Sequence, residues 1–226
     1  MTDLTTTPAT PATAPVDPER PGADHRPRRP YDGEKGRRMA DFTDEYQDYL
    51  EGYIFGDLDN VADRMLALLR STALLEHGHE VTQLEHMLQT ATRADAAGAE
   101  PDIVLAALFH DIGKVVSNSN HPAVSAEMLR PWVSDEAYWV VKVHQDFQGI
   151  HYFDRMGLDP MMRTKHADHP SYDLAAQFVD EWDQEAFDPY FASKPVEYFE
   201  PLVREVFGRR PRRFASDAPT WTGTPA

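Results

Sequence analysis

The helical spacing of apolar residues is the feature that most constrains the fold of this chain. From Asp41 onward, apolar side chains recur three and four positions apart, as Met65, Leu66 and Leu69 do in NVADRMLALLRSTALLEHG. Residues at that spacing lie on one face of a helix. No stretch shows strand alternation over a useful length, and no internal repeat is present. We therefore predict an all-α fold, a bundle of roughly seven helices.

Both ends of the chain differ in composition from the middle. Residues 1–38 are rich in Thr, Pro, Ala and Arg and show no apolar period, so they cannot bury enough surface to offset the entropy of ordering. A basic, proline-bearing segment follows Gly208. We predict a disordered tail over residues 1–38, a helical domain over 39–208 and a second disordered tail over 209–226.

Charge and residue usage limit the partners of the protein. The formal charge is −16 and the basic residues gather mainly at the two ends, so the acidic middle should repel nucleic acid. No run approaches the roughly 20 apolar residues that cross a bilayer, so we expect no membrane segment. The N-terminus lacks a secretory signal and the chain has no cysteine, which favours a cytoplasmic location. The oligomeric state is left open.

Several histidines stand where predicted helices would turn them inward. In LFHDIGK, His110 and Asp111 end an apolar run; His86 lies beside an apolar stripe, His121 opens a short helix and His144 ends YWVVKV. A lone histidine in such a place is more often a hydrogen-bonded core or cap residue. As a set, these nitrogen and oxygen donors, without sulfur, suit iron, manganese, zinc or another borderline divalent ion.

The sequence resembles the HD-domain metalloproteins, whose pattern is a first His, then His-Asp, then further histidines and a final Asp on separate helices. The resemblance covers about residues 80–207 and runs through TQLEHMLQ, LAALFHDIGK, HPAVSAEML, VVKVHQDF and DEWDQEAFDP. It implies an HD-type helical bundle in which one ion is held by His86, His110, Asp111 and Asp183. It also implies that Asp111 bridges to a second ion held by His121 and His144.

Two reactions use this ligand set in HD proteins. One is phosphoester hydrolysis, and the other is oxygenation by a mixed-valent Fe(II)/Fe(III) pair, as in myo-inositol oxygenase and the small phosphonate-cleaving oxygenases. The flanking residues look closest to the phosphonate-cleaving enzymes. We therefore expect a di-iron oxygenase that uses O2 on a small hydroxyl-bearing polar substrate, with an organophosphonate as one candidate. The alternatives are a phosphohydrolase for a nucleotide or other phosphomonoester, using manganese or another divalent metal, and a non-enzymatic protein with a structural metal.

Some substrate contacts follow from the same resemblance. Lys114 matches a substrate-contacting lysine of myo-inositol oxygenase, whereas the phosphonate-cleaving enzyme has a histidine there. We assign catalytic roles to Asp111 and Lys114, and Lys114 is also a candidate substrate-binding residue. His79 falls roughly where related oxygenases carry a residue that contacts the substrate. Gln83 could orient a ligand, or it could be a surface glutamine.

Basic, histidine and aromatic residues later in the chain allow two interpretations. Arg163 and Lys165 could bind an anionic group of the substrate, or they could balance the acidic body at the surface. In KHADHPSYD, a separate metal site could by spacing be formed by His166, Asp168, His169 and Asp173, but the proline-bearing loop favours a role at the pocket entrance. In YF, Tyr152 and the phenylalanine after it could wall the pocket, although such aromatic residues are usually core.

Overall fold

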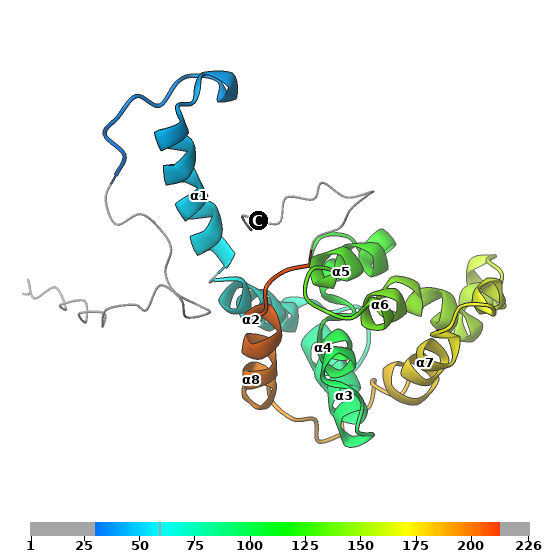
Figure 1. The fold of residues 1–226 in the computed structure, drawn as a ribbon. Helices are drawn as coiled ribbons and strands as arrows, with labels where there is room; N and C mark the ends of the chain where they lie inside the picture. The colour runs from blue at the N-terminus through cyan, green and yellow to red at the C-terminus, as the bar shows by residue number, and fades with distance from the viewer. Residues whose placement is uncertain (1–29, 59, 213–226) are drawn as a thin grey trace, which may run out of the picture. The chain divides into compact units, whose positions relative to one another are not determined.

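The computed structural model describes residues 30–58 and 60–212 of the chain. The described residues contain eight α-helices and no β-strand, so the predicted all-α fold is confirmed (Figure 1). The described residues divide into two compact units, 30–58 and 60–212. Most of the two predicted tails, namely residues 1–29 and 213–226, lies outside the described residues.

The first unit contains one α-helix, α1 (Asp44–Leu58), which follows a 3-10 turn at Met39–Asp41. The side chain of Thr43 accepts a hydrogen bond from the Tyr46 main-chain N–H at 3.2 Å, and so caps the start of this helix. The ring of Tyr31 lies 5.0 Å from that of Tyr46, between centroids. Part of the segment that we predicted as a tail therefore packs on this helix.

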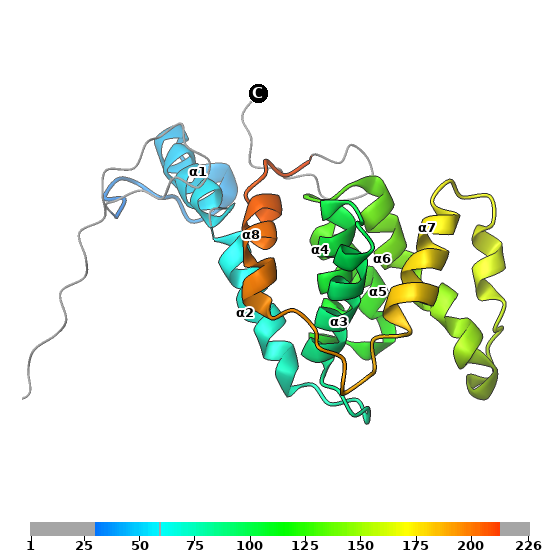
Figure 2. The same cartoon turned by 90° about the horizontal axis from the view of Figure 1, so that it is seen from below.

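The second unit holds seven α-helices; with α1 of the first unit, the described part of the predicted domain 39–208 has eight, one more than the roughly seven predicted. In chain order the helices of the second unit are α2 (Val61–Ser71), α3 (Gln83–Ala96), α4 (Pro101–Phe109), α5 (His121–Leu129), α6 (Asp135–Gln148), α7 (Tyr172–Gln177) and α8 (Val196–Phe207). A π-helix, Phe178–Asp183, continues α7. Figures 1 and 2 show α2 beside α8, with α4 between α3 and the pair formed by α5 and α6.

The apolar helix α4 lies at the centre of this bundle. Every residue from Ile103 to Phe109 is buried, as expected for a helix that is hydrophobic on all sides. It packs against α3, α6 and α8. Residues 209–212 of the predicted C-terminal tail are also in contact with the bundle, since Arg209 forms a 2.6 Å ion pair with Asp102 on α4.

Local sequence signals set the start of α3 and the turn after α4. Thr82 and Glu85 form a capping box that starts α3. After α4 the chain turns through a 3-10 helix, Ile112–Val115, whose Gly113 N–H donates to Ser125 Oγ on α5 at 2.9 Å. A Cβ at Gly113 would meet the carbonyl oxygen of His121 at 2.5 Å, so only glycine permits this close approach of the turn to α5.

A long connection, residues 149–171, joins α6 to α7, and we call it the strap. It contains three 3-10 helices, Gly149–His151, Phe153–Met156 and Met162–His166. Its C-terminal half is anchored on α6, where the His169 ring stacks on Trp139 with centroids 3.6 Å apart. No helix in the described part of the chain combines the length and apolar character needed to cross a membrane.

Candidate metal centre

Six buried residues from different parts of the second unit meet in one place, and we call them the His/Asp cluster. They are His86 on α3, His110 and Asp111 at the end of α4, His121 at the start of α5, His144 on α6 and Asp183 at the end of the π-helix. Their ligand atoms form three overlapping groups, each compact enough to hold a metal ion. The structure thus brings together all six residues that the resemblance implied.

Main-chain carbonyl groups fix how each histidine ring is oriented. The Nδ1 atoms of His86, His110, His121 and His144 lie 3.0, 2.9, 2.8 and 2.6 Å from the carbonyl oxygens of Ala186, Ala107, Asn118 and Val141. A carbonyl oxygen only accepts hydrogen bonds, so each Nδ1 must carry a proton and donate it. Each Nε2 is therefore directed into the cluster as the atom available to a metal, as is usual for histidine ligands.

The four Nε2 atoms meet in two facing pairs. His86 Nε2 lies 3.1 Å from His110 Nε2, and His121 Nε2 lies 3.2 Å from His144 Nε2. Two nitrogen lone pairs at this distance repel each other unless a proton or a metal ion lies beside them. Burial lowers the pKa of His144, which favours its neutral ring and leaves its Nε2 free to bind a metal.

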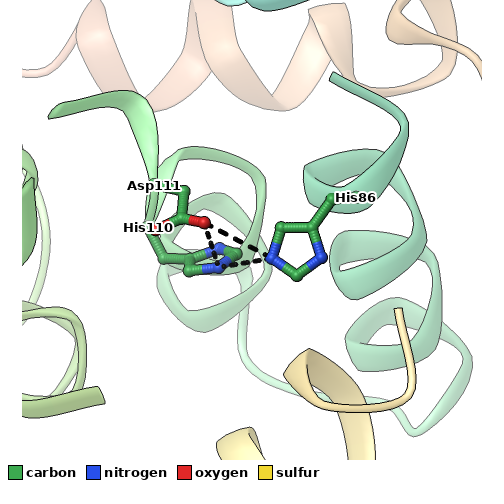
Figure 3. Close-up of side chains that lie close together, drawn as sticks. All are labelled: His86, His110 and Asp111. Atoms are coloured by element: carbon green, nitrogen blue, oxygen red, sulfur yellow. Dashed lines mark hydrogen bonds and ion pairs between the residues drawn. The ribbon is translucent and has the colours of Figure 1, made fainter. Parts of the chain in front are cut away.

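The carboxylate of Asp111 spans both pairs of histidines. Its Oδ2 lies 3.4 Å from His86 Nε2 and 3.5 Å from His110 Nε2 (Figure 3). Its Oδ1 lies 3.0 Å from His121 Nε2 and 3.5 Å from His144 Nε2. One oxygen therefore faces each pair, which is the arrangement that a bridging ligand requires.

Asp183 completes the set on the side of His86 and His110. Its Oδ1 lies 3.1 Å from His86 Nε2 and 3.3 Å from His110 Nε2. The Oδ1 atoms of Asp183 and Asp111 are buried without a hydrogen-bond partner, which is costly unless a cation is bound there. These orphaned oxygens and the facing nitrogens fit bound metal, and in the division that the resemblance implies, His86, His110 and both carboxylates would hold one ion and Asp111, His121 and His144 a second.

The charged groups of the cluster stabilise one another. Burial would lower the pKa of His86, but its interactions with the carboxylates of Asp111 and Asp183 outweigh burial and raise the pKa to about 9. Burial opposes the charge of both carboxylates as well, yet attraction to His110 holds the pKa of Asp111 and of Asp183 well below the usual range. Two carboxylates thus stay ionised inside the bundle, as metal ligands must.

A cavity of about 590 Å³ opens beside the cluster, and His86 and His121 form part of its wall. Three predicted substrate-binding residues, His79, Gln83 and Lys114, also line it, together with Tyr152. Lys114 Nζ donates to Asp111 Oδ2 at 2.6 Å, while Gln83 Nε2 donates to the same oxygen at 2.9 Å. Lys114 and Gln83 therefore contact both the candidate bridge and the space where a substrate would lie.

Several residues of this cavity were not predicted from the sequence, among them His77, Asn118, Gln145, Gln148, His151, Met156, Gln184 and Phe187. Helical spacing could have identified Gln148, because it follows His144 by four residues and so shares its helix face. The same reasoning does not reach His77, which precedes α3, or His151 and Met156, which lie in the strap.

The structure does not bring Arg163 and Lys165 to the cavity. Arg163 forms a 2.7 Å ion pair with Asp180, and the half-exposed Lys165 forms one of 2.9 Å with Asp146. Both cations are thus paired with acidic residues outside the cavity wall, as in the alternative interpretation of their sequence.

A second metal site in KHADHPSYD is not present among the described residues, where every group able to hold an ion belongs to the His/Asp cluster. His166 instead hydrogen-bonds Asp146 at 2.8 Å, and His169 stacks on Trp139. These side chains anchor the strap and do not line the cavity entrance. Phe153 is likewise a buried core residue.

The all-α bundle and its buried histidine and aspartate cluster, which could bind metal ions, are features of a helical metal-binding protein. Residues 84–188 match the family model of the HD domain, and all six residues of the cluster lie within that segment. The match supports the HD-domain superfamily of metal-dependent hydrolases and oxygenases, and the predicted HD-type helical bundle is confirmed.

A further similarity is confined to a short stretch. Over 43 residues, the chain is 46% identical to "Uncharacterized protein L432" of Acanthamoeba polyphaga mimivirus. The stretch covers 19% of this chain and 20% of that protein. The similarity is too short to add to what the cluster itself indicates about function.

Proposed function

We propose that the protein is a di-iron oxygenase that uses O2 to oxidise or cleave a small polar substrate bearing hydroxyl groups. The observation that carries this proposal is the chemistry of the cavity wall, where five carboxamide side chains lie beside five histidines and a single lysine. The carboxamides belong to Gln83, Asn118, Gln145, Gln148 and Gln184. A carboxamide both donates and accepts hydrogen bonds, and so matches a hydroxyl group.

The charge of the cavity argues against a phosphoester as the substrate. Lys114 is the single lysine or arginine among the described residues that line it. Phosphate groups are typically bound by arginine side chains through paired hydrogen bonds, but Arg163 is held by Asp180 away from this wall. One lysine suits a substrate with a single anionic group, such as a hydroxy acid, or a neutral polyol.

The two proposed ions would differ in their number of protein ligands. The ion beside His86 would have four protein ligands, whereas the ion beside His144 would have three, with Asp111 shared between them. When bound, a mixed-valent Fe(II)/Fe(III) pair supplies open coordination positions for the substrate hydroxyl and for O2. Each ion would have a ligand in the cavity wall, His86 or His121, and a substrate hydroxyl would bind beside His121, where fewer protein ligands would hold the ion. Lys114 would bind the substrate next to Asp111.

The metal and the co-substrate test this proposal together. We expect anaerobically purified protein to contain two irons per chain and to give a coupled mixed-valent electron paramagnetic resonance signal when half reduced. O2 consumption should follow the addition of a polyol, a hydroxy acid or a hydroxylated phosphonate from a small panel. Hydrolysis of phosphomonoesters by the manganese-loaded protein without O2 uptake would replace the oxygenase with the phosphohydrolase.

Two lysine variants examine the role of the cavity. Lys114→Met should raise KM by about tenfold or more, because it removes the cation nearest the proposed substrate position. Lys165→Met is the matched control, since Lys165 pairs with Asp146 outside the cavity wall. Equal kinetics for the two variants would contradict the assignment of Lys114.

A further inference from the structure

A glutamine side chain donates a hydrogen bond to each of the two carboxylates of the His/Asp cluster. Gln83 Nε2 donates to Asp111 Oδ2 at 2.9 Å, and Gln148 Nε2 donates to Asp183 Oδ2 at 3.1 Å. In both aspartates the other oxygen, Oδ1, is buried and has no hydrogen-bond partner. Each carboxylate therefore accepts a hydrogen bond at Oδ2, while its Oδ1 is available to a metal ion.

We propose that Gln148 is a positioning residue of the metal centre, the counterpart at Asp183 of Gln83 at Asp111. An aspartate carboxylate rotates readily about its Cβ–Cγ bond, since this terminal torsion is broad. The bond from Gln148 stops that rotation with Oδ1 of Asp183 directed at His86 Nε2, 3.1 Å away. The inference rests on the metal site of the proposed function and not on the reaction.

The printed side-chain donor to Asp183 Oδ2 is the neutral amide of Gln148, whereas Asp111 Oδ2 also accepts a hydrogen bond from Lys114 Nζ at 2.6 Å. An amide N–H orients the carboxylate and leaves its full negative charge to the metal, as second-shell partners of metal ligands commonly do. Asp183 is fully buried, so water cannot replace the hydrogen bond that Gln148 donates to its carboxylate.

The position of Gln148 on α6 also connects the two halves of the cluster. It is the last residue of α6 and lies one turn beyond His144, on the same helix face. His144 would bind the ion beside His121, while Gln148 contacts Asp183, which would bind the ion beside His86. One helix therefore positions groups around both ions.

Metal titration of the full-length protein, freed of metal with a chelator and loaded with Co(II) in the absence of substrate, tests this inference. In Gln148→Met, we expect one of the two ions to bind about 10–100-fold more weakly and the other to be little affected. In Gln83→Met, both ions should bind more weakly, because Asp111 is shared. The visible spectrum of Co(II) reports separately on a change in coordination.

Gln184→Met is the matched control. Gln184 lines the same cavity, but its Nε2 bonds to the carbonyl oxygen of Asp180 at 3.0 Å and to Glu185 at 2.8 Å, not to a cluster residue. The Co(II) affinity of Gln184→Met should equal that of the unmodified protein. Wild-type affinity for both ions in Gln148→Met, or an equal loss in Gln184→Met, would overturn the proposal.

A second variant keeps the test valid if Gln148→Met does not fold, as judged by circular dichroism. Gln148→Asn keeps the amide but shortens its reach by one methylene, so it should lose affinity for the same ion. Unchanged affinity in Gln148→Asn would also count against a positioning role. Because neither O2 nor substrate is present, the outcome is independent of whether the enzyme proves to be an oxygenase.

Discussion

In the metal-free protein, His86 should hold a proton that a metal ion must displace. Its pKa is raised to about 9, so its ring is charged at neutral pH. The proton to be lost is on Nε2, since Nδ1 donates to the Ala186 carbonyl oxygen. Binding of the ion beside His86 therefore releases one proton, and its apparent affinity should rise about tenfold per pH unit up to pH 9. The gain between pH 7 and pH 9 is about 50-fold, because half of the rings still carry the proton at a pH equal to the pKa.

The same proton should stabilise the metal-free fold. The folded-state pKa of about 9 lies above the ordinary value of 6.5, so this stabilisation is complete below pH 6.5 and is lost as the pH rises through 9. The difference of about 2.5 pH units corresponds to about 3 kcal/mol of unfolding free energy. Metal affinity and metal-free stability should thus change in opposite directions over one pH range.

Urea unfolding of chelator-treated protein at several pH values between 6 and about 9.5 measures the stability, and Co(II) competition against a chelator of known affinity measures the binding. His86→Gln is the control, because it removes the titrating ring and should abolish the His86 contribution to both slopes. A metal-free stability that does not fall between pH 6.5 and 9, together with a Co(II) affinity that does not rise, would refute the reasoning.

Three further predictions follow from the same geometry. Asp111→Ala should lose both ions and His144→Ala chiefly one, as measured by the metal content of the purified variants; two tightly held ions in Asp111→Ala would contradict the bridge. Gly113→Ala should destabilise the fold by about 1–3 kcal/mol and weaken the ion at His121, because its Cβ would meet the His121 carbonyl oxygen; urea unfolding and Co(II) titration measure the two effects. Removing residues 1–38 should leave metal content and activity unchanged, since the cluster lies wholly within the second unit, and a loss of either would assign the segment a role.

The helices and the His/Asp cluster were predictable from the sequence for different reasons. The helices follow from apolar spacing and from local signals such as the Thr82 and Glu85 capping box. Spacing alone did not identify the cluster, because a buried histidine such as His86 has the same sequence surroundings whether it binds a metal or caps a helix. The family pattern supplied the set, and the geometry then showed that the Nε2 atoms converge.

The cavity wall was less predictable, because its residues come from separate segments. Arg163 and Asp180 are 17 positions apart and pair only after the strap has folded onto α6 and the π-helix, so nothing local shows where this cation points. His77 precedes the capping box and has no helical neighbours that would indicate its direction. Spatial partners, and not residue type, decide which polar side chains reach a substrate.

The π-helix at Phe178–Asp183 makes the length of that segment as important as its composition. Its wider turn contains more residues than an α-helical turn, and the last of them is Asp183. Deleting one residue would restore an ordinary α-helix with its apolar side chains intact, but would rotate the carboxylate by about 100° around the helix axis. Such a protein could fold normally and still bind one ion poorly. Single-residue insertions and deletions, more than most substitutions, should therefore separate folding from metal binding here.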